Sequence, residues 1–269
     1  MIDKFHPIDK EVRGMFDAFV RGGRVFAKGS TCTVYMIARD CEEPLTANLA
    51  VLEELAESFK GFEVNALTND CTDSTADILD RWRPPFDTRH INEENGRPMM
   101  PSPRGADRTV PLADYRNRVR EGSRVSDVYL VIDPDIRCIK PERLLAGLGE
   151  MMSTGHGVMA AQQLAYVPEI HPNRMINYDA FAWRPAWTWR QDDQRELSFF
   201  HDVRPVGAPA YQVNSAFGGA AWYHADTDFR RTDYDGTNGC EHVGLHRQMA
   251  DRWAWKYTVA ISPAMTILR

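Results

Sequence analysis

Two carboxylates separated by one residue follow an apolar run of the chain. Residues 127–132 read Asp-Val-Tyr-Leu-Val-Ile, and Asp133, Pro134 and Asp135 come next. Paired carboxylates on a turn can converge on a hard divalent cation, and such a cation can bridge a diphosphate. The alternative is a solvated β-turn in which Pro134 fixes the bend. The apolar run favours the cation site, because it has the composition of a buried strand.

Two further polar clusters follow strand-like runs. Arg39 and Asp40 come after residues 33–38, and Asn69 and Asp70 come after the run that begins at residue 62. Open α/β sheets bind ligands outside the carboxyl ends of their strands. Three such strand ends therefore predict one shared rim that carries a ligand site.

A further group of reactive side chains lies near residue 240. Residues 241–252 have the pattern of a helix that begins with Glu241 and His242, and His246 lies one turn further on. Residues four apart share a helix face. Two roles stay open: Glu241 as the base that deprotonates a hydroxyl, and His242 or His246 as a metal ligand. The plain alternative is a Glu241 that stabilises the helix N-terminus and histidines on a satisfied face.

The elements that position these residues alternate between helical and strand periodicity. Helices are predicted over residues 8–20, 44–59, 76–82, 111–121 and 141–152, and strands over 33–38, 62–67, 127–132 and 157–161. Gly22 and Gly23 are predicted to end the first helix, and the proline-rich residues 83–108 to form a long loop. This order predicts an α/β fold with parallel strands. Beyond residue 166 the pattern becomes irregular and aromatic, so we expect a substrate half there.

Composition places the chain among ordinary globular proteins. Its 269 residues are 43% hydrophobic and 26% charged, which excludes disordered, collagen-like and coiled-coil chains. No stretch reaches the ~20 apolar residues of a membrane span, and residues 1–10 lack a signal-peptide core, so we expect a cytoplasmic protein without a membrane partner. The five cysteines are widely spread without a Cys-x-x-Cys pair, and we expect reduced thiols.

One basic segment stands out in this acidic chain. The formal net charge is −6, yet residues 81–124 contain ten arginines against six acids. The overall charge argues against bulk electrostatic binding of nucleic acid, although a local basic groove is compatible with it. The segment has two interpretations, a solvated face or a face that binds an anion.

In their order and spacing, seven short motifs resemble the GT-A fold glycosyltransferases. They are Cys41-Glu42, Asn69-Asp70-Cys71-Thr72-Asp73-Ser74-Thr75, Arg116-Asn117, Asp133-Pro134-Asp135, Tyr178-Asp179-Ala180-Phe181-Ala182, Asn214-Ser215-Ala216-Phe217-Gly218-Gly219 and Cys240-Glu241-His242-Val243. The later motifs resemble bacterial and viral (phage-type) glycosyltransferases that are related to fungal capsule mannosyltransferases. The resemblance spans about residues 33–250. It implies an α/β, GT-A (Rossmann-like) fold with a mixed, mostly parallel sheet flanked by helices.

The resemblance implies a single GT-A domain over residues 1–269, with a nucleotide-sugar half at about 30–160 and an acceptor half at about 161–269. On the donor side it implies roles in binding the base, the ribose and the diphosphate for Ala38, Arg39, Asn69, Asp70, Arg116 and Asp133. It implies a metal site formed by Asp133 and Asp135, with His242 and His246 as candidate further ligands. Glu241 and Asp135 are the implied catalytic residues.

On the acceptor side the resemblance implies roles for Tyr178, Asp179, Phe217, Gly218 and Gly219. Residues 215–219 are small and flexible around Phe217, which suits a close approach of the backbone to a sugar. The alternative is a core strand with a bulge.

The first hypothesis is a glycosyltransferase that uses a divalent metal, Mn or Mg, and a nucleoside diphosphate sugar, with UDP and glucose or another hexose expected. The acceptor is either a glycan or hydroxymethylpyrimidine in phage DNA. In the DNA case the protein would act in the host cytoplasm, and the arginine-rich segment, with Trp82 and Phe86, would track phosphates and stack a flipped base.

Two alternatives remain. A sugar-nucleotide nucleotidyltransferase usually needs a glycine-rich loop after the first strand, where this chain has Arg39-Asp40-Cys41-Glu42. A non-catalytic sugar-binding protein is favoured only without a metal site. The sugar, the acceptor, the stereochemical outcome and the oligomeric state stay open.

Overall fold

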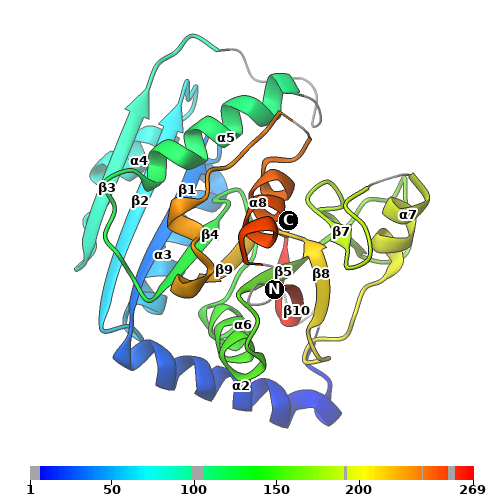
Figure 1. Ribbon diagram of the computed structural model, residues 1–269. Coiled ribbons are helices and arrows are strands. Elements are labelled where there is room, and N and C mark those ends of the chain that lie inside the picture. Colours follow the sequence, from blue (N-terminus) through cyan, green and yellow to red (C-terminus); the bar gives the residue numbers. More distant parts are fainter. Residues whose placement is uncertain (1–6, 98–105, 191–192, 238, 254–257) are drawn as a thin grey trace.

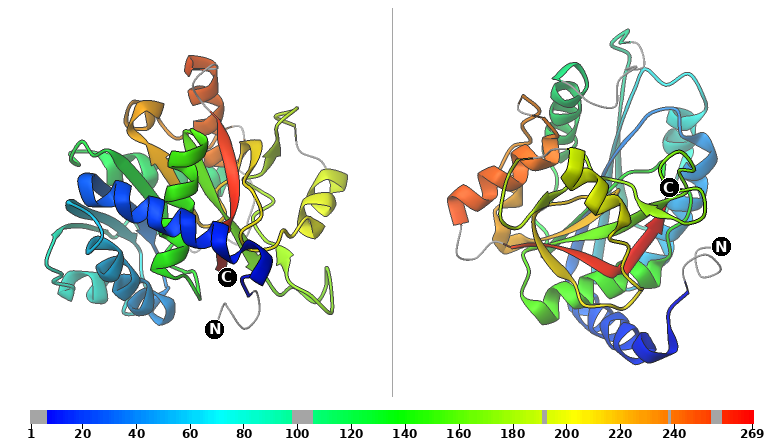
Figure 2. Two further views of the ribbon diagram at one scale, coloured as in Figure 1. Left: turned by 90° about the horizontal axis from the view of Figure 1, so that it is seen from below. Right: turned by 90° about the vertical axis from the view of Figure 1, so that its right-hand side faces the viewer.

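The strands form a single mixed sheet, which lies between two layers of helices (Figures 1 and 2). The computed structural model describes residues 7–97, 106–190, 193–237, 239–253 and 258–269. The strands in these residues are β1 (Thr31–Ala38), β2 (Gly61–Asn69), β3 (Asp87–Glu93), β4 (Val128–Ile132), β5 (Val158–Ala165), β6 (Ile176–Asn177), β7 (Arg184–Pro185), β8 (Tyr211–Ser215), β9 (Ala220–His224) and β10 (Val259–Leu268). The helices are α2 (Lys10–Gly29), α3 (Glu42–Ala56), α4 (Thr75–Arg81), α5 (Ala106–Arg120), α6 (Pro141–Thr154), α7 (Asp193–His201), α8 (Glu241–Trp253) and the short 3₁₀ helices η1 (Ala225–Thr227) and η2 (Phe229–Arg231).

The strand order is β3-β2-β1-β4-β9-β5-β10-β8-β7, and β6 pairs with β5 beside this path. Strands β3, β2, β1 and β4 are parallel neighbours, and β9 lies antiparallel between β4 and β5. Across the described sheet seven strands run one way, and only β6, β8 and β9 run the other way. The prediction of a mixed, mostly parallel sheet flanked by helices is confirmed.

Successive residues of β1 face different helix layers, as side chains of a strand must. Val34 joins a core that includes Leu145 of α6, and Tyr35 joins a core on the other face that includes Tyr115 of α5. The strand is therefore buried on both faces, which explains its continuous apolar run. The carboxyl ends of β1, β2 and β4 meet at one edge of the sheet, as the sequence predicts.

Helix α2 continues through Gly22 and Gly23 to Gly29, so the predicted end of this helix is wrong. A Cβ atom at Gly23 would lie 2.1 Å from the carbonyl oxygen of Leu145, and one at Gly149 would lie 1.9 Å from that of Phe19. The glycines thus let α2 and α6 pack with their backbones in contact. This packing outweighs the ~1 kcal/mol that a glycine costs inside a helix.

The predicted loop over residues 83–108 contains regular structure, which corrects that prediction. Strand β3 pairs in parallel with β2 at the edge of the sheet, and α5 begins at Ala106 with Pro111 inside it. The strand reads Asp-Thr-Arg-His-Ile-Asn-Glu, and its polar composition hides it from apolar periodicity because an edge strand is half solvated. Residues 98–105 of the predicted loop lie outside the described residues.

Strand β10 is not predicted from the sequence, because Ser262 and Pro263 interrupt its apolar run, and its pairing with β5 shifts register at this point. None of the helices in the described ranges combines the length and the apolar character needed to cross a bilayer.

Candidate functional site

A cavity of about 430 Å³ opens at the edge of the sheet where β1, β4 and β5 end. Residues with a predicted site role that line it are Arg39, Arg116, Asp133, Asp135, Tyr178, Asp179, Phe217, Glu241 and His242. The structure thus brings together side chains from both halves of the chain. Gln163 of β5 and Arg269 also line the cavity, although they belong to none of the sequence motifs.

Arg116 lies at the centre of the charged residues of this cavity. It projects from α5, is 5% exposed, and donates from Nη2 to Asp133 Oδ1 at 3.0 Å and from Nε to Glu241 Oε1 at 3.1 Å. Burial opposes its charge, but Asp133 and Glu241 outweigh burial and raise the pKa of Arg116. A permanent cation therefore joins the strand-end carboxylate to the carboxylate at the start of α8.

The two carboxylates of the Asp133-Pro134-Asp135 turn have different surroundings. Burial raises the pKa of Asp133 to about 6, and the nearby charge of Asp135 adds to this while Arg116 opposes it. Asp135 is more exposed, and its Oδ2 lies 3.1 Å from Nη2 of Arg269. The guanidinium of Arg269 in turn lies 4.5 Å from the centroid of the Tyr178 ring. Arg269 could not be found by motif, because no spacing links it to Asp135.

His242 is a buried, neutral imidazole next to these carboxylates. Its ring stacks on Phe217 with centroids 3.8 Å apart, and its Nε2 is 3.8 Å from Glu241 Oε1. Within the described structure neither ring nitrogen has a hydrogen-bond partner. Burial, followed by the charge of Arg116, lowers the pKa of His242 well below its usual value. A neutral imidazole with a free nitrogen is suited to metal binding.

His246 lies deeper and outside the cavity. Its Nδ1 is 2.9 Å from Ser215 Oγ and its Nε2 is 3.1 Å from Tyr223 Oη. Burial lowers its pKa to about 3, so the ring is neutral. Because both nitrogens are engaged, the structure does not bring His246 into the site as a metal ligand.

Asp179 is a second buried carboxylate of the cavity. Its Oδ2 accepts a hydrogen bond from the backbone N–H of Gly218 at 2.9 Å, and its Oδ1 accepts from that of Ala182 at 3.4 Å. Burial raises the pKa of Asp179. It therefore faces the cavity from the predicted acceptor half with a fixed orientation.

Gly218 and Gly219 support the wall rather than line it. Both have a positive φ, and a Cβ atom at Gly218 would lie 2.1 Å from the carbonyl oxygen of Ala161. The carbonyl oxygen of Gly219 accepts a hydrogen bond from the backbone N–H of Asp133 at 2.8 Å. These glycines form the turn between β8 and β9, which corrects the alternative of a bulged core strand across residues 215–219.

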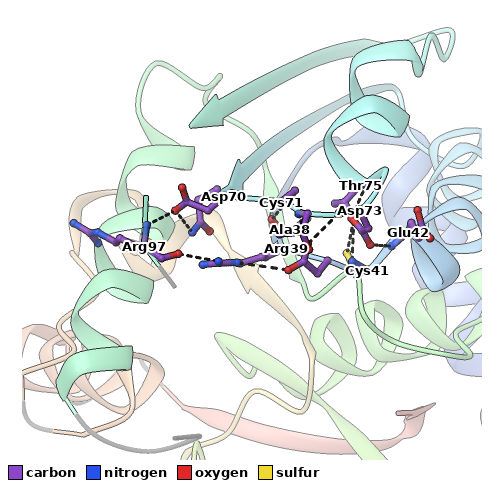
Figure 3. Close-up of polar contacts among 12 residues, drawn as sticks. Ala38, Arg39, Cys41, Glu42, Asp70, Cys71, Asp73, Thr75 and Arg97 are labelled. Atoms are coloured by element: carbon purple, nitrogen blue, oxygen red, sulfur yellow. Dashed lines mark hydrogen bonds and ion pairs between the residues drawn. The ribbon is translucent and has the colours of Figure 1, made fainter. Parts of the chain in front are cut away.

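Of Ala38, Arg39, Asn69 and Asp70, which the resemblance assigns to nucleotide binding, only Arg39 lines the cavity. Polar groups of Arg39 and Asp70 already have partners within the fold (Figure 3). Asp70 has a φ of 47°, and its carboxylate accepts from the backbone N–H groups of Gly96 at 2.7 Å and Arg97 at 3.2 Å. Desolvation opposes these bonds, but they lower the pKa of Asp70. Arg39 donates from Nη2 to the carbonyl oxygen of Arg97 at 2.8 Å. Ala38, Asn69 and Asp70 do not line the cavity.

Two groups of residues are candidates for binding a metal ion. Among the described residues, only Asp40, Cys71 and Asp73 bring three ligand atoms within 4.8 Å of one another, and Asp40 Oδ1 already accepts from Thr72 N at 2.6 Å. The predicted ligands Asp133, Asp135 and His242 are not gathered as tightly. Their chemistry nevertheless fits a divalent cation, since two carboxylates and a neutral imidazole suit Mn²⁺, and oxygen ligands alone suit Mg²⁺.

Comparison with known proteins agrees with this architecture. No protein-family model and no curated protein matches the sequence. TarS residues 1–349 from S. aureus match with a TM-score of 0.51 and 12% identity over 88% of this chain and 59% of TarS 1–349. The mannosyltransferase PcManGT from Pyrobaculum calidifontis, solved with GDP-Man and Mn²⁺, matches with a TM-score of 0.54 and 12% identity over 96% of this chain and 68% of that chain.

Glucosyl-3-phosphoglycerate synthase from Mycobacterium tuberculosis, solved with Mn²⁺, UDP and glucosyl-3-phosphoglycerate, matches with a TM-score of 0.51. Its identity is 11%, over 93% of this chain and 74% of that chain. These three structural neighbours are glycosyltransferases of the GT-A fold, so the chain has that fold. At these identities the likeness extends to the fold alone.

Proposed function

We propose that this protein is a metal-dependent glycosyltransferase that moves a sugar from a nucleoside diphosphate to a hydroxyl group. One observation carries the proposal: Arg116 joins Asp133, at the end of β4, to Glu241, at the start of α8, in one cavity. The carboxylate expected near the diphosphate, Asp133, and the one expected to activate the acceptor, Glu241, thus both pair with the guanidinium of Arg116. Similarity in fold to enzymes solved with UDP or GDP-Man and Mn²⁺ supports the proposal.

The donor would lie across the rim with its diphosphate near Asp133 and Asp135. These two residues and His242 would hold a divalent cation, Mn or Mg, which would offset the charge of the departing nucleoside diphosphate. Arg116 would add a fixed positive charge in a buried site, where it needs little reorganisation as charge develops. UDP and a hexose are the donor groups we propose, with the nucleotide held by the half at residues 30–160.

Two carboxylates compete for the role of base. Glu241 is the predicted one, and its orientation is fixed by Arg116. Asp179 is the second candidate, because burial raises its pKa and a higher pKa improves a carboxylate as a proton acceptor. Both face the cavity from the proposed acceptor half at residues 161–269.

The structure favours a glycan over DNA as the acceptor. Arginines of the basic segment that pair with other residues of this chain include Arg89 with Asn65, Arg116 with Asp133, Arg118 with Glu93, Arg120 with Phe229 and, at the surface, Arg124 with Asp87. Arginines whose guanidinium groups are already hydrogen-bonded or ion-paired do not form a surface that binds the phosphates of DNA. Trp82 and Phe86 pack edge to face, with ring centroids 5.6 Å apart, and Trp82 donates to Glu53, so neither is a free stacking platform.

A panel of nucleotide sugars tests the proposal. The protein is incubated with UDP-glucose, UDP-galactose, UDP-N-acetylglucosamine or GDP-mannose, with Mn²⁺, Mg²⁺ or EDTA, and release of nucleoside diphosphate is measured with oligosaccharides or hydroxymethylcytosine duplex present. We expect metal-dependent release that an oligosaccharide stimulates and the duplex does not. Release of pyrophosphate from a nucleoside triphosphate and a sugar phosphate would instead indicate a nucleotidyltransferase. Binding of a sugar without turnover would indicate a sugar-binding protein.

A further inference from the structure

Gln163 is a buried side chain of the cavity whose amide nitrogen has no partner. It lies near the end of β5 and is 4% exposed, and its Nε2 makes no hydrogen bond within the described structure. Gln163 lines the same cavity as Asp133 and Asp179. A buried amide donor without an acceptor loses its hydration and gains nothing in return, so a bound acceptor atom would stabilise it.

The neighbouring glutamine of the same strand shows that the fold satisfies such groups elsewhere. Gln162 is 1% exposed, and its Nε2 donates to the carbonyl oxygen of Arg204 at 2.9 Å and to Thr266 Oγ1 at 3.1 Å. Its Oε1 accepts from Arg204 N at 2.9 Å. The two side chains point to opposite faces of β5, because side chains alternate along a strand. The glutamine without a partner is the one that faces the cavity.

The neighbours of the Gln163 side-chain amide place it between the two proposed halves of the site. A Cβ atom at Gly219 would lie 2.6 Å from Gln163 Nε2, so the amide lies directly against this glycine. The carbonyl oxygen of Gly219 accepts from Asp133 N, and that of Gln163 accepts from Tyr178 N at 2.9 Å. The amide therefore lies between the carboxylate turn of the proposed donor side and the Tyr178-Asp179 segment of the proposed acceptor side.

We propose that Gln163 donates a hydrogen bond from Nε2 to a hydroxyl oxygen of the donor's sugar and so determines which sugar is accepted. The inference rests on the proposed function. Charged partners for a diphosphate are already present in Arg39, Arg116 and Arg269, which line the same cavity. A neutral amide suits a neutral hydroxyl, and a site with such a buried donor rejects a ligand that leaves the donor unpaired.

The test compares Gln163→Met with wild type, since methionine keeps the length of the side chain and removes the hydrogen bonds. Calorimetry in Mn²⁺ measures binding of UDP, of GDP and of the nucleotide sugars of the panel above. We expect the variant to bind the nucleoside diphosphate as wild type does and to bind the preferred nucleotide sugar about tenfold more weakly. Gln212→Met, a substitution at an exposed glutamine of β8, is the matched control and should change neither affinity.

Donors that lack one hydroxyl identify the contact. Among UDP-sugars deoxygenated at C2, C3, C4 or C6, one should bind wild type about tenfold more weakly than the parent sugar, and Gln163→Met should not distinguish it from the parent. Melting temperatures of the variants show whether they are folded.

Three results would overturn the inference. An equal loss of affinity for the nucleoside diphosphate and the nucleotide sugar would make Gln163 a structural residue. Unchanged affinity for both would remove it from sugar recognition while leaving the proposed function intact. If wild type bound none of the nucleotides or nucleotide sugars, the proposed function would fail, and the role of Gln163 with it.

Discussion

Asp135 Oδ2 lies 3.1 Å from Arg269 Nη2, so an arginine that follows β10 neutralises the second carboxylate of the turn after β4. Both side chains are about two-fifths exposed, at 43% for Asp135 and 39% for Arg269. Ion pairs with this exposure contribute at most about 1 kcal/mol. A divalent cation can therefore displace Arg269 from Asp135 at little cost.

Asp135→Asn should reduce Mn²⁺-dependent binding of UDP at least about tenfold, because a carboxylate ligand becomes a neutral amide. Stability should change by less than about 1 kcal/mol, since the lost ion pair is exposed. Calorimetry with UDP in Mn²⁺ and in EDTA measures the first effect, and urea denaturation measures the second. Equal UDP affinity in both proteins would remove Asp135 from the site.

Arg116→Gln should destabilise the fold by about 3 kcal/mol. The change leaves Asp133 and the buried Glu241 without the cation that joins them, and breaking a buried ion pair is costly for this reason. Arg118→Gln on the same helix is the control, because Arg118 is 38% exposed and its ion pair with Glu93 is partly solvated. Its cost should stay below about 1 kcal/mol. Equal costs in urea denaturation would contradict the central place of Arg116.

Glu241→Gln should lower sugar transfer by about a hundredfold or more while donor affinity stays within about twofold, as expected for the loss of a base. Asp179→Asn is measured alongside it, since the two carboxylates are the candidates of the cavity. The variant with the larger fall in kcat at unchanged nucleotide-sugar affinity identifies the base. Wild-type turnover in Glu241→Gln would leave Glu241 with only its structural bond to Arg116.

His246 should make the protein less stable as the pH falls below about 6.5. In the folded state its pKa is lowered to about 3 by burial, whereas in the unfolded chain it is about 6.5. Between these values the unfolded chain binds one proton more, so the free energy of unfolding falls by up to about 1.4 kcal/mol per pH unit. His246→Gln removes this proton uptake and should reduce the slope between pH 6.5 and 5 in urea denaturation, while the uptake by His242 remains. The same slope in both proteins would refute this linkage.

The ends of β1, β2 and β4 could be predicted from the sequence, because buried parallel strands are continuous apolar runs and the polar residues after them must meet at one edge. Gly22 and Gly23 do not end the helix, because they allow the close approach of α6, whose Leu145 and Gly149 backbones lie against them. A local pattern contains no information on such a long-range contact.

The candidate site could also be predicted from the sequence only in part. The cavity contains Asp133, Glu241 and His242, which a motif could locate, but the ion pair that joins Arg116 to Glu241 links residues 125 positions apart in the sequence. Gln163 has no motif at all. Its significance comes from a missing hydrogen bond, which only a three-dimensional structure can reveal.

The position of β10 in the sheet imposes an order on assembly. Strand β10 lies between β5 and β8, and β8 joins the described sheet only through β10, while β7 joins through β8. During synthesis residues 259–268 leave the ribosome after both of these strands, so β7 and β8 cannot join the sheet until β10 has been made. The block β3-β2-β1-β4 needs no later strand and can form earlier. A nascent chain would then hold the turn at Asp133 before the opposite wall of the cavity exists, and contacts this distant in sequence favour slow folding.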